Sequence, residues 1–149
     1  MVRWLAFNLL LFGCCGYALR RGGPPERLGG LIFLLAAALT VLGASPFGIR
    51  FQHVELGILL VDAAVLYAFI VLAIRSERFW PIWVAGLQTV EVFTHFARLV
   101  TPGIIPPAYG EAVALWSYPT LVLLAIGTWR HRRRLERFGA DNPWKNASR

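Results

Sequence analysis

Five apolar blocks joined by short polar connections constrain the fold of this chain more than any other feature. A transmembrane helix needs about 20 predominantly apolar residues, and each block approaches that length. No long polar segment remains that could form a second domain. We therefore predict an all-α integral membrane bundle of five transmembrane helices as one domain, residues 1–130, followed by a basic cytoplasmic tail, residues 131–149. The predicted spans are about 4–19, 28–44, 54–74, 79–100 and 111–129.

The composition agrees with membrane insertion. Hydrophobic residues make up 57% of the 149 residues and charged residues only 15%, whereas about a quarter of an ordinary soluble domain is charged. The main competing prediction is a four-span protein, in which the first block is cleaved as a signal peptide or lies in the interface. Cleavage before Cys14 is disfavoured, because Phe12 is bulky where lipoprotein signals prefer a small or β-branched residue.

The positions of the Lys and Arg residues match an alternating arrangement of membrane spans. The net charge is +7, and if five spans alternate, one side receives 12 of the 15 Lys and Arg residues. The positive-inside rule then places the N-terminus outside and the C-terminus inside. A nucleic-acid surface needs a basic groove interleaved with stacking aromatics, and the sequence shows none. We therefore predict a multi-pass protein of a cell inner membrane that does not bind nucleic acid.

The fourth block carries the most polar face of any predicted span. Gln88, Glu91, His95 and Arg98 fall within an arc of roughly 80° when each residue turns a helix by about 100°. Ionisable side chains are costly in hydrocarbon, so such a face normally points toward other helices or trapped water. This face, together with Glu55 and Asp62 of the third block, is the candidate binding site.

The turn between the third and fourth blocks sets the depth of the acids. Counted from its centre at position 76.5, Asp62 and Glu91 are both 14.5 positions away, and Glu55 and Arg98 are both 21.5 away. In a straight antiparallel hairpin, equal counts mean equal depth. We expect Arg98 to pair with Glu55 near the outer interface, and Asp62 to face Glu91 as a carboxyl pair, with His95 as a possible counter-charge. The alternative is that the same residues serve helix contacts or anchor the chain at the interface.

No catalytic residue, metal or cofactor is assigned. Glu91 and His95 share a helix face, and Asp62 or His53 would add a third ligand, but a spacing of four residues arises on any polar helix face. Cys14 and Cys15 are adjacent, which gives poor disulfide geometry, so we expect them to be small buried hydrophobic residues.

Two local features give further expectations. Pro119 should bend the fifth helix or open its first third. Tryptophans near the ends of the blocks are typical of an aromatic belt at the membrane interface.

Three function classes fit this pattern. The first is an accessory or scaffold subunit of a membrane complex, which would act through helix faces toward a membrane-protein partner or a second copy. The second is a small transporter or proton- or ion-handling protein that uses the polar face. The third is a membrane enzyme acting on a lipid or quinone; enzymatic activity is the least favoured of the three. The bilayer itself is a partner, and the basic segment 129–137 could bind anionic lipid or only set the topology. In composition, the chain resembles small inner-membrane proteins of bacteria with GC-rich genomes.

Overall fold

The computed structural model describes residues 2–43, 56–100 and 106–145. Apart from one isolated β-bridge, all regular secondary structure within these ranges is helical. The prediction of an all-α bundle is confirmed. Each predicted span corresponds to a helix. The ends differ by up to four residues in the first four helices, whereas α5 begins five residues before the predicted span and ends nine residues after it. The helices are α1 (Val2–Arg21), α2 (Pro24–Gly43), α3 (Leu56–Arg75), α4 (Trp80–Val100) and α5 (Pro106–Phe138).

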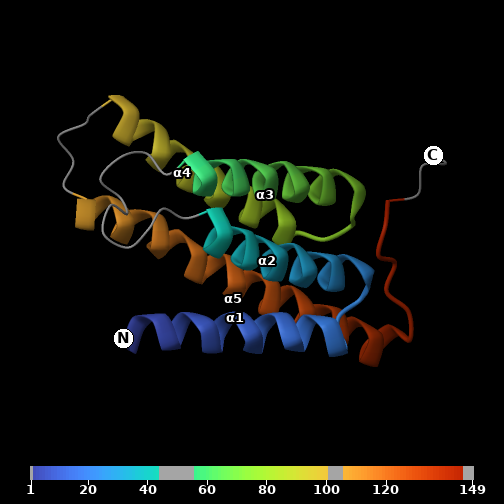
Figure 1. Ribbon diagram of the computed structural model, residues 1–149. Coiled ribbons are helices and arrows are strands. Elements are labelled where there is room, and N and C mark those ends of the chain that lie inside the picture. Colours follow the sequence, from blue (N-terminus) through green and yellow to red (C-terminus); the bar gives the residue numbers. More distant parts are fainter. Residues whose placement is uncertain (1, 44–55, 101–105, 146–149) are drawn as a thin grey trace.

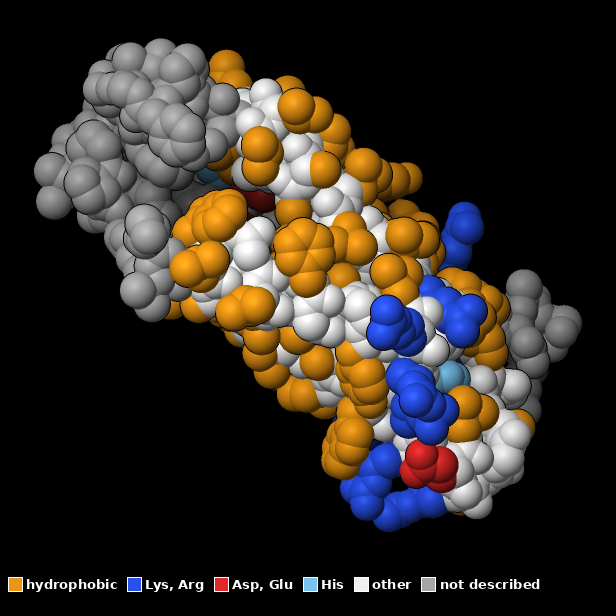
Figure 2. Space-filling model, turned by 60° about the horizontal axis from the view of Figure 1, so that its bottom comes forward, with side chains coloured by type: hydrophobic (Ala, Val, Ile, Leu, Met, Phe, Trp, Pro, Cys, Tyr) orange, Lys and Arg blue, Asp and Glu red, His pale blue; other side chains and the backbone are white. Residues whose placement is uncertain are grey.

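The helices run side by side with alternating direction (Figure 1). Each helix packs against its neighbour in sequence, α5 closes the ring by packing against α1, and α2 also contacts α5. The α1–α2 link, the α3–α4 turn and the C-terminal tail consequently lie at one end of the bundle, which we call the basic end. Figure 2 shows Lys and Arg side chains gathered there, while hydrophobic side chains cover much of the rest of the described surface on the face in view.

The helix ends differ from the predicted spans. The predicted spans leave residues 20–27 as a connection, but only Gly22 and Gly23 separate α1 from α2, because proline is compatible with a first helical turn. The basic tail does not begin as a separate segment, since α5 continues to Phe138. Of the two outcomes expected for Pro119, an opened first third is not observed, because α5 is continuous through this position.

Trp80 lies at the centre of the core instead of in an interfacial belt. It is fully buried at the start of α4, and its ring packs edge-on against Phe69, with centroids 5.8 Å apart. The indole fits between two glycines on other helices. A Cβ at Gly29 would lie 2.4 Å from Trp80 Cη2, and one at Gly127 would lie 2.3 Å from Cδ1. The close approach of α2, α4 and α5 therefore requires glycine at both positions.

Cys14 and Cys15 are buried and unpaired, in agreement with their predicted packing role. They form one core cluster with residues from the other helices, including Phe33, Phe69 and Leu124. The core is therefore a mixed apolar interior to which all five helices contribute.

Among the described residues, two helices are long and apolar enough to cross a membrane, α2 and α3. The other three carry more polar or charged side chains: α4 holds the polar face, and α1 ends in Arg20 and Arg21. The helical bundle and these two apolar helices are therefore established, whereas the placement of all five helices across a bilayer is a matter of proposal.

Candidate functional site

A polar cluster lies inside the half of the bundle that is remote from the basic end. It consists of Asp62 on α3, Gln88, Glu91 and His95 on α4, and Ser117 on α5. His95 and Asp62 form its centre, with His95 Nε2 2.9 Å from Asp62 Oδ2. The His95 side chain is fully buried, and the Asp62 side chain is 11% exposed. Together they form a buried pair that joins α3 to α4.

Glu91 is the second carboxyl of the polar cluster. It is one helical turn from His95, is 4% exposed, and accepts a hydrogen bond of 3.1 Å from the Ser117 hydroxyl. Gln88, 3% exposed, also hydrogen-bonds to Glu91, and Asp62 is near enough to interact with it electrostatically. The polar face of α4 therefore points inward, toward α3 and α5.

The structure refines the carboxyl pair expected from the hairpin register. Asp62 and Glu91 do share one interior cluster, but the immediate partner of Asp62 is His95, and that of Glu91 is Ser117. The register placed the residues at the right height, while the rotation of each helix decided which atoms meet. Ser117 was not anticipated. A hydroxyl two residues before Pro119, within an apolar block, was the available signal.

Two of the six predicted binding residues are not placed by the structure. Glu55 lies outside the described residues, as does His53, and the side chain of Arg98 on α4 is not described. The predicted Arg98–Glu55 pair is therefore untested.

Among the described side chains, the polar cluster holds two acids and one imidazole but no Lys or Arg. In the described part of the chain, no Lys or Arg forms an ion pair with Asp62 or Glu91. One imidazole can neutralise only one carboxylate, and a second buried charge is expensive in an apolar interior. A shared proton or a bound small cation would remove this cost. Within the described ranges, no three His, Cys, Asp or Glu side chains converge as metal ligands.

A second polar network, which sequence reasoning missed, holds the basic end together. The fully buried Glu26 at the start of α2 forms an ion pair of 3.0 Å with Arg78 and accepts a hydrogen bond of 3.2 Å from the Trp80 indole. Arg78 in turn makes two contacts of 2.9 Å with Asp141 in the tail. The ion pairs therefore run from α2 through the α3–α4 turn to the C-terminal segment.

Asp141 is the acceptor that gathers this network. His131 Nδ1 lies 2.5 Å from it, and Arg134 Nε donates at 2.8 Å. Burial alone would raise the pKa of Asp141, but the hydrogen bonds from Arg134, Arg78 and His131 outweigh it and lower the pKa below the ordinary value. The carboxylate is therefore kept ionised among the basic groups.

The tail also pairs with the α3–α4 turn through its backbone. Gly139, with φ of 70°, reverses the chain after α5. Ser76 and Trp144 then form an isolated antiparallel bridge, and Lys145 N donates to Arg75 O at 2.9 Å. The sequence signal for this chain reversal was Asp141, an acid that follows Gly139 in an otherwise basic tail. Its target on the turn could not be read from the sequence.

No protein-family model matches the chain, and no curated protein or solved structure shows detectable similarity to it. The functional argument therefore depends on the two polar sites and on the surface of the bundle.

Proposed function

We propose that this chain is a five-span inner-membrane protein whose polar cluster binds protons or a small monovalent cation. Its membrane placement is supported by the large hydrophobic side chains that are exposed on every helix, such as Leu9 at 74%, Leu42 at 81%, Tyr67 at 71%, Phe93 at 66% and Leu115 at 62%. A water-soluble monomer rarely exposes so much apolar surface. The concentration of Lys and Arg at the basic end supports an inward C-terminus.

The observation that carries the proposed activity is the buried Asp62–His95 pair with Glu91 one turn away. A purely structural contact between helices needs one hydrogen bond, whereas this cluster holds two carboxyls beside an imidazole. No Lys or Arg among the described side chains forms an ion pair with either carboxyl. A buried cluster with two carboxyls can reduce its negative charge by binding a proton or a cation. Acidic side chains inside membranes typically serve ion or proton pathways. The chain would act as a small transporter or proton-handling protein.

Proton flux into liposomes tests the proposal. The purified protein is reconstituted with pyranine inside the vesicles, and a pH gradient is imposed while K⁺ and valinomycin clamp the potential. We expect the wild type to admit protons faster than empty vesicles, and Glu91→Gln to reduce that flux at least tenfold. Glu136→Gln removes an acid on the exposed surface of α5 and should leave the flux unchanged. Equal flux for Glu91→Gln and the wild type would overturn a proton pathway through Glu91.

Proton binding is measured separately by infrared titration, because a coupled transporter need not leak. The polar cluster should show a protonated-carboxyl band that changes between wild type and Glu91→Gln. A spectrum identical in both proteins at every pH would remove Glu91 as a proton site. Repeating the titration in Na⁺ and in K⁺ distinguishes a cation site, since a bound cation displaces the proton and shifts the band.

An accessory subunit is the second candidate, and the outer face of α4 favours it. Trp83, Val90 and Phe93 are exposed by 63%, 40% and 66% and share one helix face with Gly86. Among the described residues, no side chain would lie within 4 Å of a Cβ at Gly86. A small residue flanked by large ones allows a second transmembrane helix to approach closely.

Co-purification in mild detergent distinguishes this role from transport. A subunit should carry a stoichiometric partner that Glu91→Gln leaves in place and that Gly86→Leu removes. Gly13→Leu, at an equally open glycine on α1, is the matched control. If Gly86→Leu retains the partner as Gly13→Leu does, the α4 face is not the contact.

A further inference from the structure

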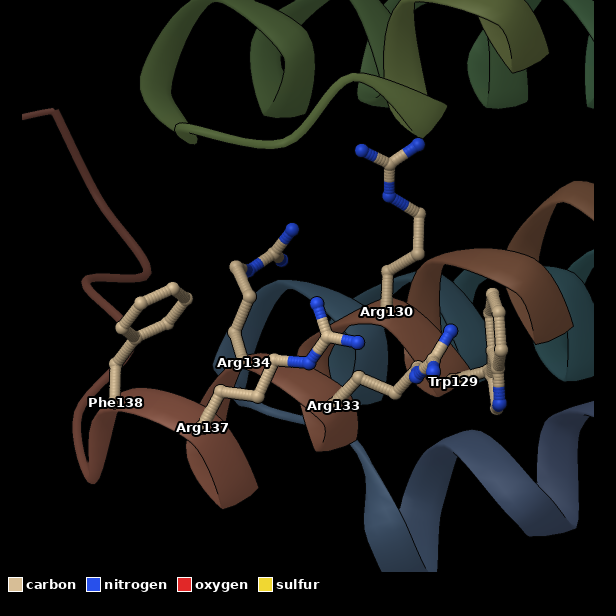
Figure 3. A pocket seen from close by; sticks show the side chains of 6 residues that line it. All are labelled: Trp129, Arg130, Arg133, Arg134, Arg137 and Phe138. Atoms are coloured by element: carbon tan, nitrogen blue, oxygen red, sulfur yellow. The ribbon is translucent and has the colours of Figure 1, made fainter.

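Four arginines line one pocket at the C-terminal end of α5. The pocket has a volume of about 290 Å³, and its walls are formed by Trp129, Arg130, Arg133, Arg134, Arg137 and Phe138. Figure 3 shows the four arginines along the end of α5, with Trp129 and Phe138 at the two ends of the row. Residues three and four apart lie on one face of a helix, so the spacing of the sequence brings these guanidinium groups together.

Most of this charge is not neutralised by the protein. Asp141 pairs with Arg134, but among the described residues no carboxylate forms an ion pair with Arg130, Arg133 or Arg137. Like charges three and four residues apart on a helix repel each other. An anion placed among them would relieve this repulsion and could accept paired N–H bonds, as phosphate does from arginine.

Three of the four arginines are held in place before any ligand binds. The Arg130 guanidinium lies 4.5 Å from the centre of the Phe79 ring, and that of Arg133 lies 4.8 Å from the Trp129 ring. Arg134 is fixed by its 2.8 Å hydrogen bond to Asp141. Side chains that are already ordered lose less conformational entropy on binding, so the pocket is preorganised.

The exposed face of α5 indicates that the anion belongs to a lipid. Val122, Ile126 and Trp129 are exposed by 44%, 39% and 50%, and their spacing continues directly into Arg133 and Arg137. One helix face therefore passes from aliphatic to aromatic to cationic side chains. This is the order in which a phospholipid presents its acyl chains, its interface and its phosphate. A soluble anion would not need the aliphatic part.

We propose that this pocket binds the headgroup phosphate of an anionic phospholipid, with the acyl chains lying along the exposed face of α5. The inference uses the membrane placement proposed above but not the activity of the polar cluster. Because three arginines are unpaired, a headgroup with two phosphates, such as cardiolipin, should bind more tightly than singly charged phosphatidylglycerol. Zwitterionic phosphatidylcholine should bind weakest.

Native mass spectrometry of the full-length protein in detergent, titrated with each of these three lipids, tests the proposal. The variant Arg133→Gln/Arg137→Gln removes two unpaired arginines from the pocket. Each basic side chain near an anionic headgroup contributes about a factor of five in affinity, so the double variant should bind cardiolipin about 25-fold more weakly. Arg75→Gln/Arg132→Gln removes the same charge at the same end of the bundle but outside the pocket, and should change binding by less than about threefold.

Several outcomes would overturn the site. Equal losses in the two double variants would mean that net charge alone attracts the lipid. Equal binding of cardiolipin and phosphatidylcholine would exclude recognition of the phosphate. If millimolar inorganic phosphate fully displaces cardiolipin, the ligand is a free anion and the assignment to lipid is wrong. Should the glutamine variant fail to purify, Arg133→Lys/Arg137→Lys keeps the charge but loses the paired N–H geometry, and a severalfold weaker affinity is then expected; unchanged affinity would contradict the pocket.

Discussion

Gly127→Ala should destabilise the bundle far more than the same substitution at Gly86. A Cβ at position 127 would lie 2.3 Å from Trp80 Cδ1, whereas ordinary contacts begin at 3.4 Å, so the ring would have to move by 3.4 − 2.3 = 1.1 Å. Gly29 blocks that movement, because the indole already fills the space on its side. The displacement would also strain the 3.2 Å hydrogen bond from the indole to Glu26.

The magnitude follows from three contributions. Overpacking of a rigid buried ring costs about 1–3 kcal/mol, and losing a hydrogen bond to a charged group costs about 1.5–3 kcal/mol. Alanine in place of glycine within a helix offsets about 0.5–1 kcal/mol. The net loss is about 2–5 kcal/mol, which corresponds to a decrease in Tm on the order of 10 °C for a chain of this length.

Thermal unfolding in detergent, followed by far-ultraviolet circular dichroism, measures this difference. Gly86→Ala is the matched control, because nothing surrounds its Cβ, and it should leave Tm unchanged or slightly raised. A second comparison uses Trp80→Leu as the background. Adding Gly127→Ala to Trp80→Leu should cost little further stability, because the indole ring that the new Cβ would contact has been removed. If Gly127→Ala and Gly86→Ala unfold at the same temperature, the inference that Trp80 packs tightly between Gly29 and Gly127 is wrong.

Two further perturbations follow from the polar sites. His95→Leu should lower stability by about 3–5 kcal/mol, because it leaves Asp62 buried without its partner. The double variant His95→Leu/Asp62→Leu should recover part of that loss in the same unfolding assay. A double variant that loses the sum of the two single-variant effects would contradict the pair. Asp141→Asn should loosen the tail, which hydrogen exchange of residues 139–145 reports as faster exchange at pH 7. The pKa of Asp141 is lowered in the folded protein, so its contribution to stability is fully present above the ordinary value of 3.8 and is lost as the pH falls through the lower folded value. The difference between Asp141→Asn and wild type should therefore start to shrink as the pH falls below about 3.8 and disappear only below the lowered folded pKa. A difference that persists in still stronger acid would show that the carboxylate charge is not its cause.

In the polar cluster, the register of the α3–α4 hairpin predicts the depth of each residue but not its contacts. Counting from the α3–α4 turn placed Asp62 and Glu91 at one depth, because helical rise is nearly constant. The count could not tell that His95 reaches Asp62 first, or that Ser117 of α5 approaches Glu91. Those contacts depend on the rotation of each helix about its axis and on a third helix that the hairpin does not contain.

The sequence by itself determined the number and order of the helices, the end of the bundle where the arginines gather, and the inward direction of the polar face on α4. These properties follow from apolar length, helical period and the cost of burying charge, all of which act locally along the chain. Tertiary structure alone decided that Trp80 fits between Gly29 and Gly127, and that Asp141 joins Arg78 to α5. The contacts of Trp80 with the two glycines and of Asp141 with Arg78 link residues about 45 to 65 positions apart, and only the packing of the helices against one another brings them within reach.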